Sequence, residues 1–563
     1  MTKRLIRIFL SLAALLAVPL VHADPLDDFA RDFWAWRSAE QPVSGDDVNR
    51  IERAAGWIPD WSPAAVQHYR QQLQQFESTW KKMDQAGWPV PRRVDYRLMG
   101  SALARVRWEL DFTRSWQRNP EFYIDQTVGA YDELLLPPPP FDAERARRIV
   151  AILNSIPGTV EDAKENLTEP AAPFARLALA QLTDIRPRLL QSVQELTPSL
   201  PPSAATALEV AAEHAAAALE SFRDYLNQRL PAMSSNTAIG RESYVFFLKN
   251  VGLIPFTPEQ ILSMGHLEWA RSVASQTYEE HRNHGMLPLQ LFKDESQQMA
   301  VEEKDELAIR RYLGSKDLLT VPDWMQHYRF LPMPKYLAAL GGPGETDDFT
   351  GPGRLKQNST RYIDPPSQNL GYFALSMAKD PRPLIVHEGV PGHYFQLALG
   401  WADSDPIRRH YYDSGANEGL GFYAEEMMLH AGLFDDSPHT REIIWNFMRL
   451  RALRVEVDVK LALGEFSMDQ AADYLKGTVP MDSGTAHAEA AMFASTPGQA
   501  ISYQIGKLLI YNFLASAQLQ KGEGFSLRAF HDFLWQNGNV PITLQRWEYL
   551  GLKDQIEAVD RLQ

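Results

Sequence analysis

The stretch from Leu384 to Leu397, with the sequence LIVHEGVPGHYFQL, constrains this chain more than any other. It places His387 directly before Glu388, and a second histidine, His393, follows six positions after the first. Two neutral imidazoles beside a glutamate are typical of a zinc hydrolase, in which the histidines bind the metal and the glutamate accepts a proton from water. Any fold of this chain must therefore bring these side chains together and supply whatever else the metal needs.

The spacing of the two histidines argues against an unbroken helix through this motif. Zinc-binding histidines on one helix are usually four residues apart, which is about 40° around the helix axis. A spacing of six would place them about 240° apart, on different faces. Pro391 also removes a backbone donor and disfavours helix at Val390. Two alternatives remain: His393 is not a ligand, or the helix bulges or breaks at Gly389–Gly392. We favour the break, because helix irregularities concentrate at functional sites.

A third protein ligand is expected, because zinc in a hydrolase usually has three and keeps one position for water. The chain contains no cysteine, so the ligands must be histidines or carboxylates. Glu418 lies 25 residues after His393, an interval that lets one helix end and a second return to the metal. Glu425 lies seven residues beyond Glu418, on the same helix face, where it would orient a ligating histidine by a hydrogen bond. We expect the same indirect role for Asn417. The alternative is that both glutamates are exposed on an ordinary helix.

The first 23 residues have the pattern of a secretory signal peptide. A basic head precedes an apolar run from Ile8 to Val21, and small residues up to Ala23 form a cleavage pattern before Asp24. We expect a mature chain that begins near Asp24, is periplasmic or secreted, and has no stable membrane insertion. The alternative is an uncleaved membrane anchor, for which the apolar run is short. The absence of cysteine leaves no site for lipid attachment.

Composition narrows the possible partners. The hydrophobic content of 45% and the aromatic content of 11% are those of a folded protein. A formal net charge of −15 argues against nucleic acid or an anionic membrane surface as the main partner. Composition does not indicate the substrate, and the sequence makes no prediction of the oligomeric state.

Apolar residues recur at helical spacing along most of the chain. The segments predicted as helices include 66–83, 93–116, 203–230 and 258–284. Asp142 and Ser203 are predicted N-caps, and the charged stretch 293–311 is predicted to be a solvated helix face. The β-compatible residues 362–373 predict a small β element ahead of the zinc motif. We expect a mainly α fold with one large helical domain, 24–563, made of an N-terminal half, 24–237, and a catalytic half, 238–563.

Three motifs that occur in order resemble the bacterial domain-of-unknown-function family 885. They are His-Glu-x-x-Pro-Gly-His at 387–393, Glu-Gly-Leu-x-x-Tyr-Ala-Glu at 418–425 and Pro-Gly-Gln-Ala-x-x-Tyr-x-x-Gly at 497–506. This family is grouped with the gluzincin-type metallopeptidases, and the resemblance covers the whole mature chain. It implies a fold similar to the mostly helical, deep-clefted oligopeptidases and carboxypeptidases. In those enzymes a similar interval separates the second histidine from the ligating glutamate, which supports Glu418 as the third ligand of one Zn²⁺ ion.

The resemblance also implies roles in substrate binding and catalysis. The related peptidases place a tyrosine from a late segment beside the developing oxyanion, and Tyr503 matches its position; the alternative is a core or rim tyrosine. Gln499, from the same motif, is predicted to contact substrate. So is Tyr372, in the segment 368–374, where metallopeptidases carry an edge strand that pairs with substrate backbone. The chain departs from the family pattern at Met492-Phe493, where an Arg-Tyr pair is expected.

Together these features predict an exported zinc hydrolase that cleaves peptide bonds of oligopeptides. Glu388 is the predicted general base and later proton donor, and Tyr503 is the predicted oxyanion donor. One alternative is a metal-dependent amidase that acts on a non-peptide or acyl amide, because the same residues would serve it. The other is a non-catalytic periplasmic binding protein with a vestigial metal site, against which the intact Glu388 argues.

Overall fold

The computed structural model describes residues 24–44, 52–341 and 346–563. The predicted signal peptide, residues 1–23, lies outside the described residues. About 69% of the chain is helical and the only other regular element in the described part is a three-stranded sheet, which confirms the mainly α prediction. Within the described residues, no helix combines the length and apolar character that crossing a bilayer requires.

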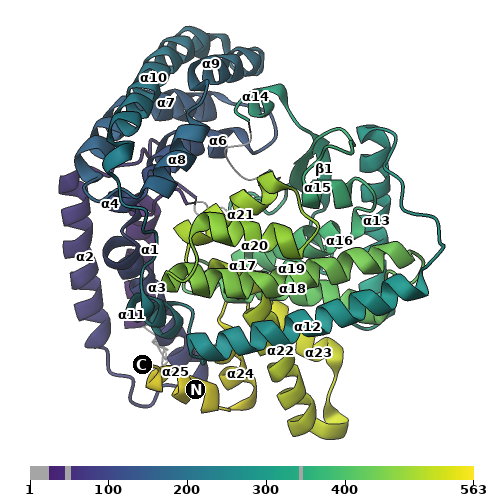
Figure 1. Cartoon of the computed structure of the whole chain (residues 1–563). Coiled ribbons are helices and arrows are strands. Elements are labelled where there is room, and N and C mark those ends of the chain that lie inside the picture. The colour runs from purple at the N-terminus through teal and green to yellow at the C-terminus, as the bar shows by residue number, and fades with distance from the viewer. Residues whose placement is uncertain (1–23, 45–51, 342–345) are drawn as a thin grey trace, which may run out of the picture.

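The N-terminal helices run along the left and top of the molecule in Figure 1. Asp142 caps α7 by accepting a hydrogen bond from the Arg145 backbone N–H at 2.8 Å, as predicted. The prediction for Ser203 was wrong, because α10 begins one residue earlier at Pro202, a residue that suits the first helical turn. The elements are α1 (Pro25–Glu40), α2 (Pro63–Lys81), α3 (Val90–Arg107), η1 (Trp108–Thr113), α4 (Ser115–Arg118), α5 (Pro120–Ile124), η2 (Asp125–Gly129), α6 (Ala130–Leu135), α7 (Ala143–Asn166), α8 (Ala172–Gln181), α9 (Ile185–Leu196), η3 (Thr197–Ser199), α10 (Pro202–Arg229) and η4 (Leu230–Ala232).

A small sheet precedes the histidine motif, as predicted, but of the predicted segment 362–373 only Tyr362 and Ile363 belong to a strand. Its strand order is β1-β3-β2, with β1 parallel to β3 from Tyr328↔Ser359 to Pro332↔Ile363 and β2 antiparallel to β3. The elements of this region are α11 (Arg241–Phe246), η5 (Phe247–Val251), α12 (Pro258–Arg282), α13 (Glu295–Ser315), β1 (Tyr328–Pro332), α14 (Lys335–Ala338), β2 (Asp347–Asp348) and β3 (Ser359–Ile363).

Helix α13 differs from its predicted environment. The stretch 293–311 was expected to be a solvated face, yet Glu302 and Glu306 are buried. Glu306 pairs with His327 at 3.0 Å and with Arg329 at 3.3 Å. These partners come from the loop and strand after α13, so the burial depends on contacts that local periodicity does not reveal.

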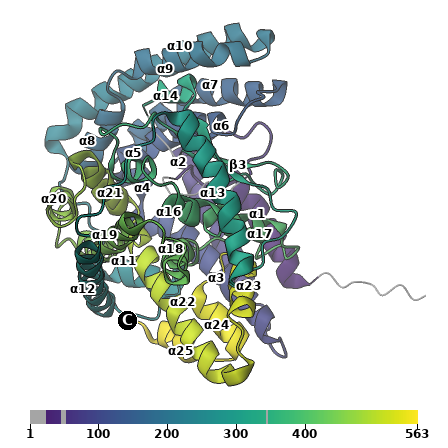
Figure 2. The ribbon, with the colours of Figure 1, turned by 90° about the vertical axis from the view of Figure 1, so that its right-hand side faces the viewer.

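The remaining helices form the lower and right part of Figure 1, where α12 and α19 lie side by side. They are α15 (Tyr372–Met377), α16 (Arg382–Leu384), η6 (Ile385–Gly389), α17 (His393–Ala402), α18 (Ser414–Ala431), α19 (Pro438–Leu463), α20 (Met468–Thr478), α21 (Ser483–Ser495), α22 (Gln499–Lys521), η7 (Gly522–Gly524), α23 (Leu527–Gln536), α24 (Ile542–Leu550) and α25 (Asp554–Arg561). Figure 2 shows α9 and α10 at one end of the molecule and α24 and α25 at the other.

Two large apolar cores stabilise the molecule, one among the N-terminal helices and one around α17, α18 and α22. The first core also contains Trp547 and Ile556 from α24 and α25, so the end of the chain packs onto its beginning. A third, smaller core lies among α19, α20 and α21.

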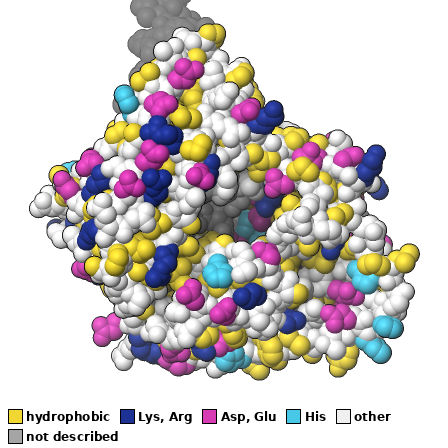
Figure 3. Space-filling model, turned by 45° about the horizontal axis from the view of Figure 1, so that its top comes forward, with side chains coloured by type: hydrophobic (Ala, Val, Ile, Leu, Met, Phe, Trp, Pro, Cys, Tyr) yellow, Lys and Arg dark blue, Asp and Glu magenta, His cyan; other side chains and the backbone are white. Residues whose placement is uncertain are grey.

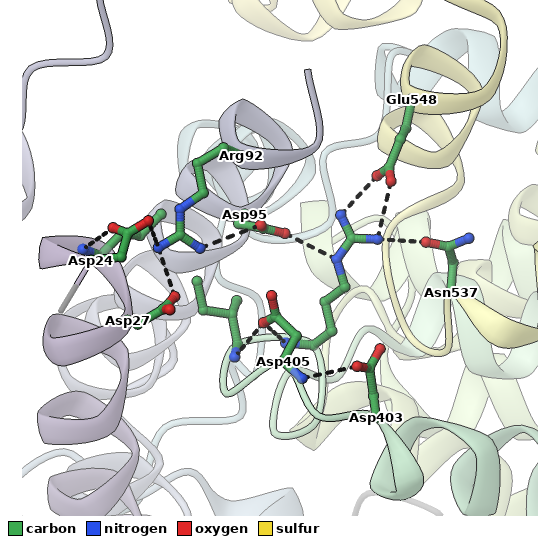
Figure 4. A network of polar contacts seen from close by, with 11 residues as sticks. Asp24, Asp27, Arg92, Asp95, Asp403, Asp405, Asn537 and Glu548 are labelled. Atoms are coloured by element: carbon green, nitrogen blue, oxygen red, sulfur yellow. Dashed lines mark hydrogen bonds and ion pairs between the residues drawn. The ribbon is translucent and has the colours of Figure 1, made fainter. Parts of the chain in front are cut away.

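A polar network joins the same regions (Figure 4). Arg92 of α3 contacts Asp27 of α1 at 2.6 Å and Asp95 at 3.5 Å. Arg408, in the loop after α17, contacts Asp95 at 3.0 Å and Glu548 of α24 at 2.8 Å. Asp95 therefore lies between two arginines, one from each half of the chain, and it connects the N-terminal helices to the loop that leads into α18.

Candidate metal centre

The histidine motif breaks where the sequence predicts a break. The π-helical turn η6 ends at Gly389, Val390 is extended, and α17 begins at His393. A Cβ atom on Gly392 would lie only 1.7 Å from the carbonyl oxygen of His387, so only glycine fits this crossing of the backbone on itself. The break turns the second helix, and the ring centroids of His387 and His393 lie 4.8 Å apart.

Both imidazoles face one carboxylate oxygen of α18. Nε2 of His387 lies 3.6 Å and Nε2 of His393 lies 3.2 Å from Oε2 of Glu418. The ligand atoms of His387, Glu388 and His393 also lie within 4.8 Å of one another. Ligands about 2.0–2.1 Å from a tetrahedral zinc ion are about 3.3–3.4 Å apart, so the two nitrogens and the Glu418 oxygen fit such an ion.

Burial separates Glu388 from the other three side chains. His387, His393 and Glu418 are buried, whereas the Glu388 side chain is 20% exposed. Its Oε2 lies 3.8 Å from Nε2 of His393. A carboxylate at the edge of the cluster that remains in contact with solvent is suited to exchanging protons, whereas the buried set is suited to holding a cation.

Glu425 orients His387 from the side opposite Glu418. Its Oε1 lies 2.7 Å from Nδ1 of His387, and Nη2 of Arg451 lies 3.0 Å from the same oxygen. A proton on Nδ1 directed at this carboxylate leaves Nε2 available to face Glu418. Burial and Arg451 both lower the pKa of His387, but the carboxylates of Glu418 and Glu425 outweigh them and raise it to about 9.

The glycines of the second motif allow α18 to approach both neighbours. A Cβ on Gly421 would lie 3.0 Å from Cε1 of His393 and 3.2 Å from Cε1 of His387. A Cβ on Gly419 would lie 2.6 Å from Cα of Gly506, a glycine of the third motif on α22. Close approach at these points brings Glu418 up to the histidines and brings α22 up to α18.

Tyr503 of α22 lies beside the cluster. The Tyr503 ring is nearly parallel to the His387 ring, with the two centroids 6.3 Å apart, and Tyr503 is buried. Arg454 of α19 lies 4.6 Å from the centroid of the Tyr503 ring, and its Nε donates to Glu489 at 2.6 Å. Arg454 also lies 5.3 Å from the centroid of Phe493. A cation therefore lies beside Tyr503 although the chain lacks an arginine at Met492-Phe493.

Sequence reasoning missed Arg451 and Arg454. Both are buried and three residues apart on α19, a helix whose neighbouring positions are mostly apolar. Two arginines within a largely apolar helix are a signal of buried ion pairing, but their partners, Glu425 and Glu489, come from α18 and α21 and cannot be read from α19 alone.

The structure gives Asn417 and Tyr372 contacts that the sequence did not reveal. The Asn417 side-chain amide donates to Oε1 of Gln396 at 2.7 Å, so it joins α18 to α17. The edge strand expected at 368–374 is wrong, because Tyr372 begins helix α15, whose first turn is stabilised by a hydrogen bond from the Tyr372 N–H to Asp482 at 3.1 Å. The Tyr372 ring packs against Phe447.

A cavity of about 1080 Å³ lies between the N-terminal helices and the half of the chain that contains the histidine motif. Its wall includes Gln499 and Ser414, which lie one helical turn before Tyr503 and Glu418 respectively. Opposite them it is lined by aromatic residues of the N-terminal half, such as Trp34 and Trp116. Figure 3 shows the molecule hollowed near its middle.

Comparison with known proteins places the chain in a family. Residues 44–547 match the family described as "Bacterial protein of unknown function (DUF885)", so the chain belongs to that family. No curated protein matches the chain.

Two solved structures share the fold. One, from Shewanella oneidensis, is described as a candidate lipoprotein of unknown function; it is 18% identical with a TM-score of 0.69, over 93% of this chain and 98% of that one. The other, a candidate lipoprotein from Colwellia psychrerythraea, is 16% identical with a TM-score of 0.74, over 96% of this chain and 100% of that one. At these identities the likeness concerns the fold alone.

Proposed function

We propose that this member of the DUF885 family is an exported, single-metal zinc hydrolase that cleaves peptide bonds of oligopeptides. The observation that carries the proposal is the convergence of His387 and His393 on one oxygen of Glu418, with Glu388 beside them. The first three residues would hold the ion. When bound, zinc acts as a Lewis acid and lowers the pKa of its water to about 7.

The other residues of the site then have separate tasks. Glu388, which is partly exposed, accepts a proton from water and passes it to the leaving amine. Glu425 holds the Nδ1 proton of His387 and so keeps Nε2 directed at the ion. The hydroxyl of Tyr503 donates a hydrogen bond to the oxyanion in a buried setting, where such a bond is strong.

The cavity supports an oligopeptide as substrate. Ligand sites usually measure about 300–1,000 Å³, and this cavity of about 1080 Å³ is slightly larger. A cavity of this size has room for an extended peptide of a few residues but not for a folded protein.

Export is supported by the N-terminal sequence and by the names of the two structural relatives, both candidate lipoproteins. This chain has no cysteine that could carry a lipid. We infer that residues 1–23 direct export.

The test combines metal analysis with digestion of a peptide mixture. The purified protein is expected to contain about one zinc ion per chain and to lose activity with a chelator. Glu388→Gln should keep the zinc and cleave about 10²- to 10⁴-fold more slowly. Glu465→Gln, at an exposed glutamate, is the matched control and should cleave normally.

Three outcomes would contradict the proposal. Full activity in Glu388→Gln would exclude its role as base. Cleavage of acyl amides but of no peptide would favour the amidase alternative. A protein that binds peptides but holds no metal and cleaves nothing would favour the binding-protein alternative.

A further inference from the structure

Two carboxylic acids project into the cavity from its N-terminal wall. Glu121 lies in α5 and Asp125 begins the π-helical turn η2, so they are one turn apart on the same face. Both line the cavity. Glu121 accepts a hydrogen bond from the Gln181 amide at 2.7 Å. A π-helical turn is rare and often marks a functional site, and here it positions Asp125.

The carboxyl group of Asp125 has no hydrogen-bond or ion-pair partner among the described residues. The Asp125 side chain is half-buried, and it lines the cavity. Burial raises its pKa well above the usual range, and Glu121 and Glu133 raise it further. Burial likewise raises the pKa of Glu121 to about 7, although Gln181 opposes the shift. An unpartnered carboxyl in such a place costs stability, so folding alone does not account for it.

The surrounding wall has the character of a cation site. Aromatic rings, whose faces attract cations, are provided by Trp34, Trp61, Trp108, Trp116 and Phe122. The described residues that line the cavity include seven carboxylic acids and three arginines. Arg37 is paired with Glu109 at 2.5 Å, and Glu489 is paired with Arg454 of α19. Without these two pairs the wall has five carboxylic acids and two arginines, an excess that favours a positively charged occupant when the acids are ionised.

We propose that Asp125 and Glu121 bind a cationic group of the peptide substrate, either the ammonium of its amino terminus or the ammonium or guanidinium group of a basic side chain. This inference rests on the proposed hydrolase function, because it names the class of peptide that the same cavity admits. The cavity reaches Ser414 and Gln499 on the side of the metal centre. A peptide within it has its cationic group at α5 and η2 and its scissile bond toward Glu418 and Tyr503.

The experiment measures binding, so that it does not depend on turnover. The zinc-loaded mature chain carrying Glu388→Gln is titrated calorimetrically with three peptides. The first is acetyl-Ala-Ala-Lys-Ala-Ala amide, whose only cation is a side chain. The second is penta-alanine amide with a free amino terminus, whose only cation is the terminal ammonium. The third is acetyl-penta-alanine amide, which has neither.

At least one cationic peptide is expected to bind on the order of ten-fold more tightly than the uncharged peptide, as for a charge-assisted hydrogen bond in a buried site. The tighter of the two identifies the side chain or the terminus as the bound cation. Adding Asp125→Asn should abolish the difference, and Asp125→Glu should restore part of it. Asp32→Asn, which removes one exposed charge from α1, is the matched control and should leave the difference unchanged.

Equal affinity for all three peptides, or a preference that survives Asp125→Asn, would overturn the inference and leave the hydrolase proposal standing. If the wild-type chain holds no zinc and cleaves nothing but still binds a cationic peptide more tightly than the uncharged one, the hydrolase proposal fails and the cation site remains. Asp125→Asn removes an unpartnered carboxyl, so its Tm should equal or exceed that of the wild type. If it does not fold, Glu121→Gln provides the same comparison.

Discussion

Two adjacent glutamates on α18 have similar burial and opposite surroundings. Glu425 and Glu426 are both buried, and successive residues of a helix point about 100° apart, so they face different sides. Glu425 contacts His387 at 2.7 Å and Arg451 at 3.0 Å. Glu426 contacts Arg271 at 2.6 Å and Lys507 at 2.8 Å.

The difference lies in what each glutamate holds in place. Burial alone would raise the pKa of Glu426, but Lys507, His430 and Arg271 lower it well below its usual range, as in a permanent ion network. That network joins α12, α18 and α22. Glu425 instead holds an imidazole whose second nitrogen faces Glu418. A buried carboxylate does not by itself indicate a metal site. A buried carboxylate whose partner has a second atom that could bind a metal, as His387 has in Nε2, does.

The largest expected effect is a loss of stability when Glu426 is substituted. Glu426→Gln leaves Lys507 buried without its closest anion, which typically costs about 3–5 kcal/mol. Thermal unfolding should show a clear fall in Tm, whereas zinc affinity should stay within about two-fold. Adding Lys507→Met should recover part of the Tm, because the second variant removes the unpaired charge. If Glu426→Gln loses zinc but keeps its Tm, Glu426 supports the metal site and the contrast with Glu425 is wrong.

The next largest effect is a loss of zinc affinity when Glu425 is substituted. Glu425→Gln retains an acceptor for Nδ1 of His387 but loses the charge, and groups that orient a metal ligand are typically worth about 10- to 100-fold in affinity. Competition with a zinc chelator measures the change, and Glu426→Gln is the matched control. Equal zinc affinity in the two variants would show that the two glutamates have the same role.

A smaller effect is expected where α18 lies against the imidazoles. Gly421→Ala places a methyl group 3.0 Å from His393, and overpacking of this kind typically costs about 1–3 kcal/mol. Zinc affinity and Tm should both fall. In Gly314→Ala on α13, the new Cβ meets no described atom within 4 Å, so this control should keep its zinc affinity and gain up to about 1 kcal/mol. Normal zinc binding in Gly421→Ala would show that α18 adjusts freely.

Features that depend on residues close together in the sequence could be predicted, and features that depend on distant residues could not. Helical periodicity and the Asp142 cap were predictable because they depend on neighbours along the chain. The burial of Glu306 and the start of a helix at Tyr372 were not, because they depend on Arg329 and Asp482, which are distant in sequence. The chemical roles of the site residues stay predictions.

The sequence by itself determined the break in the histidine motif. Pro391 has no backbone N–H to donate, which excludes a continuous helix here. Gly392 lies so close to the carbonyl oxygen of His387 that no residue with a Cβ fits in its place. Only the tertiary structure decided what surrounds the two histidines. Arg451 reaches Glu425 from another helix, and Asp125 faces a cavity enclosed by both halves. The energies of charge pairing and burial depend on distances between segments far apart in the chain, and those distances exist only after folding.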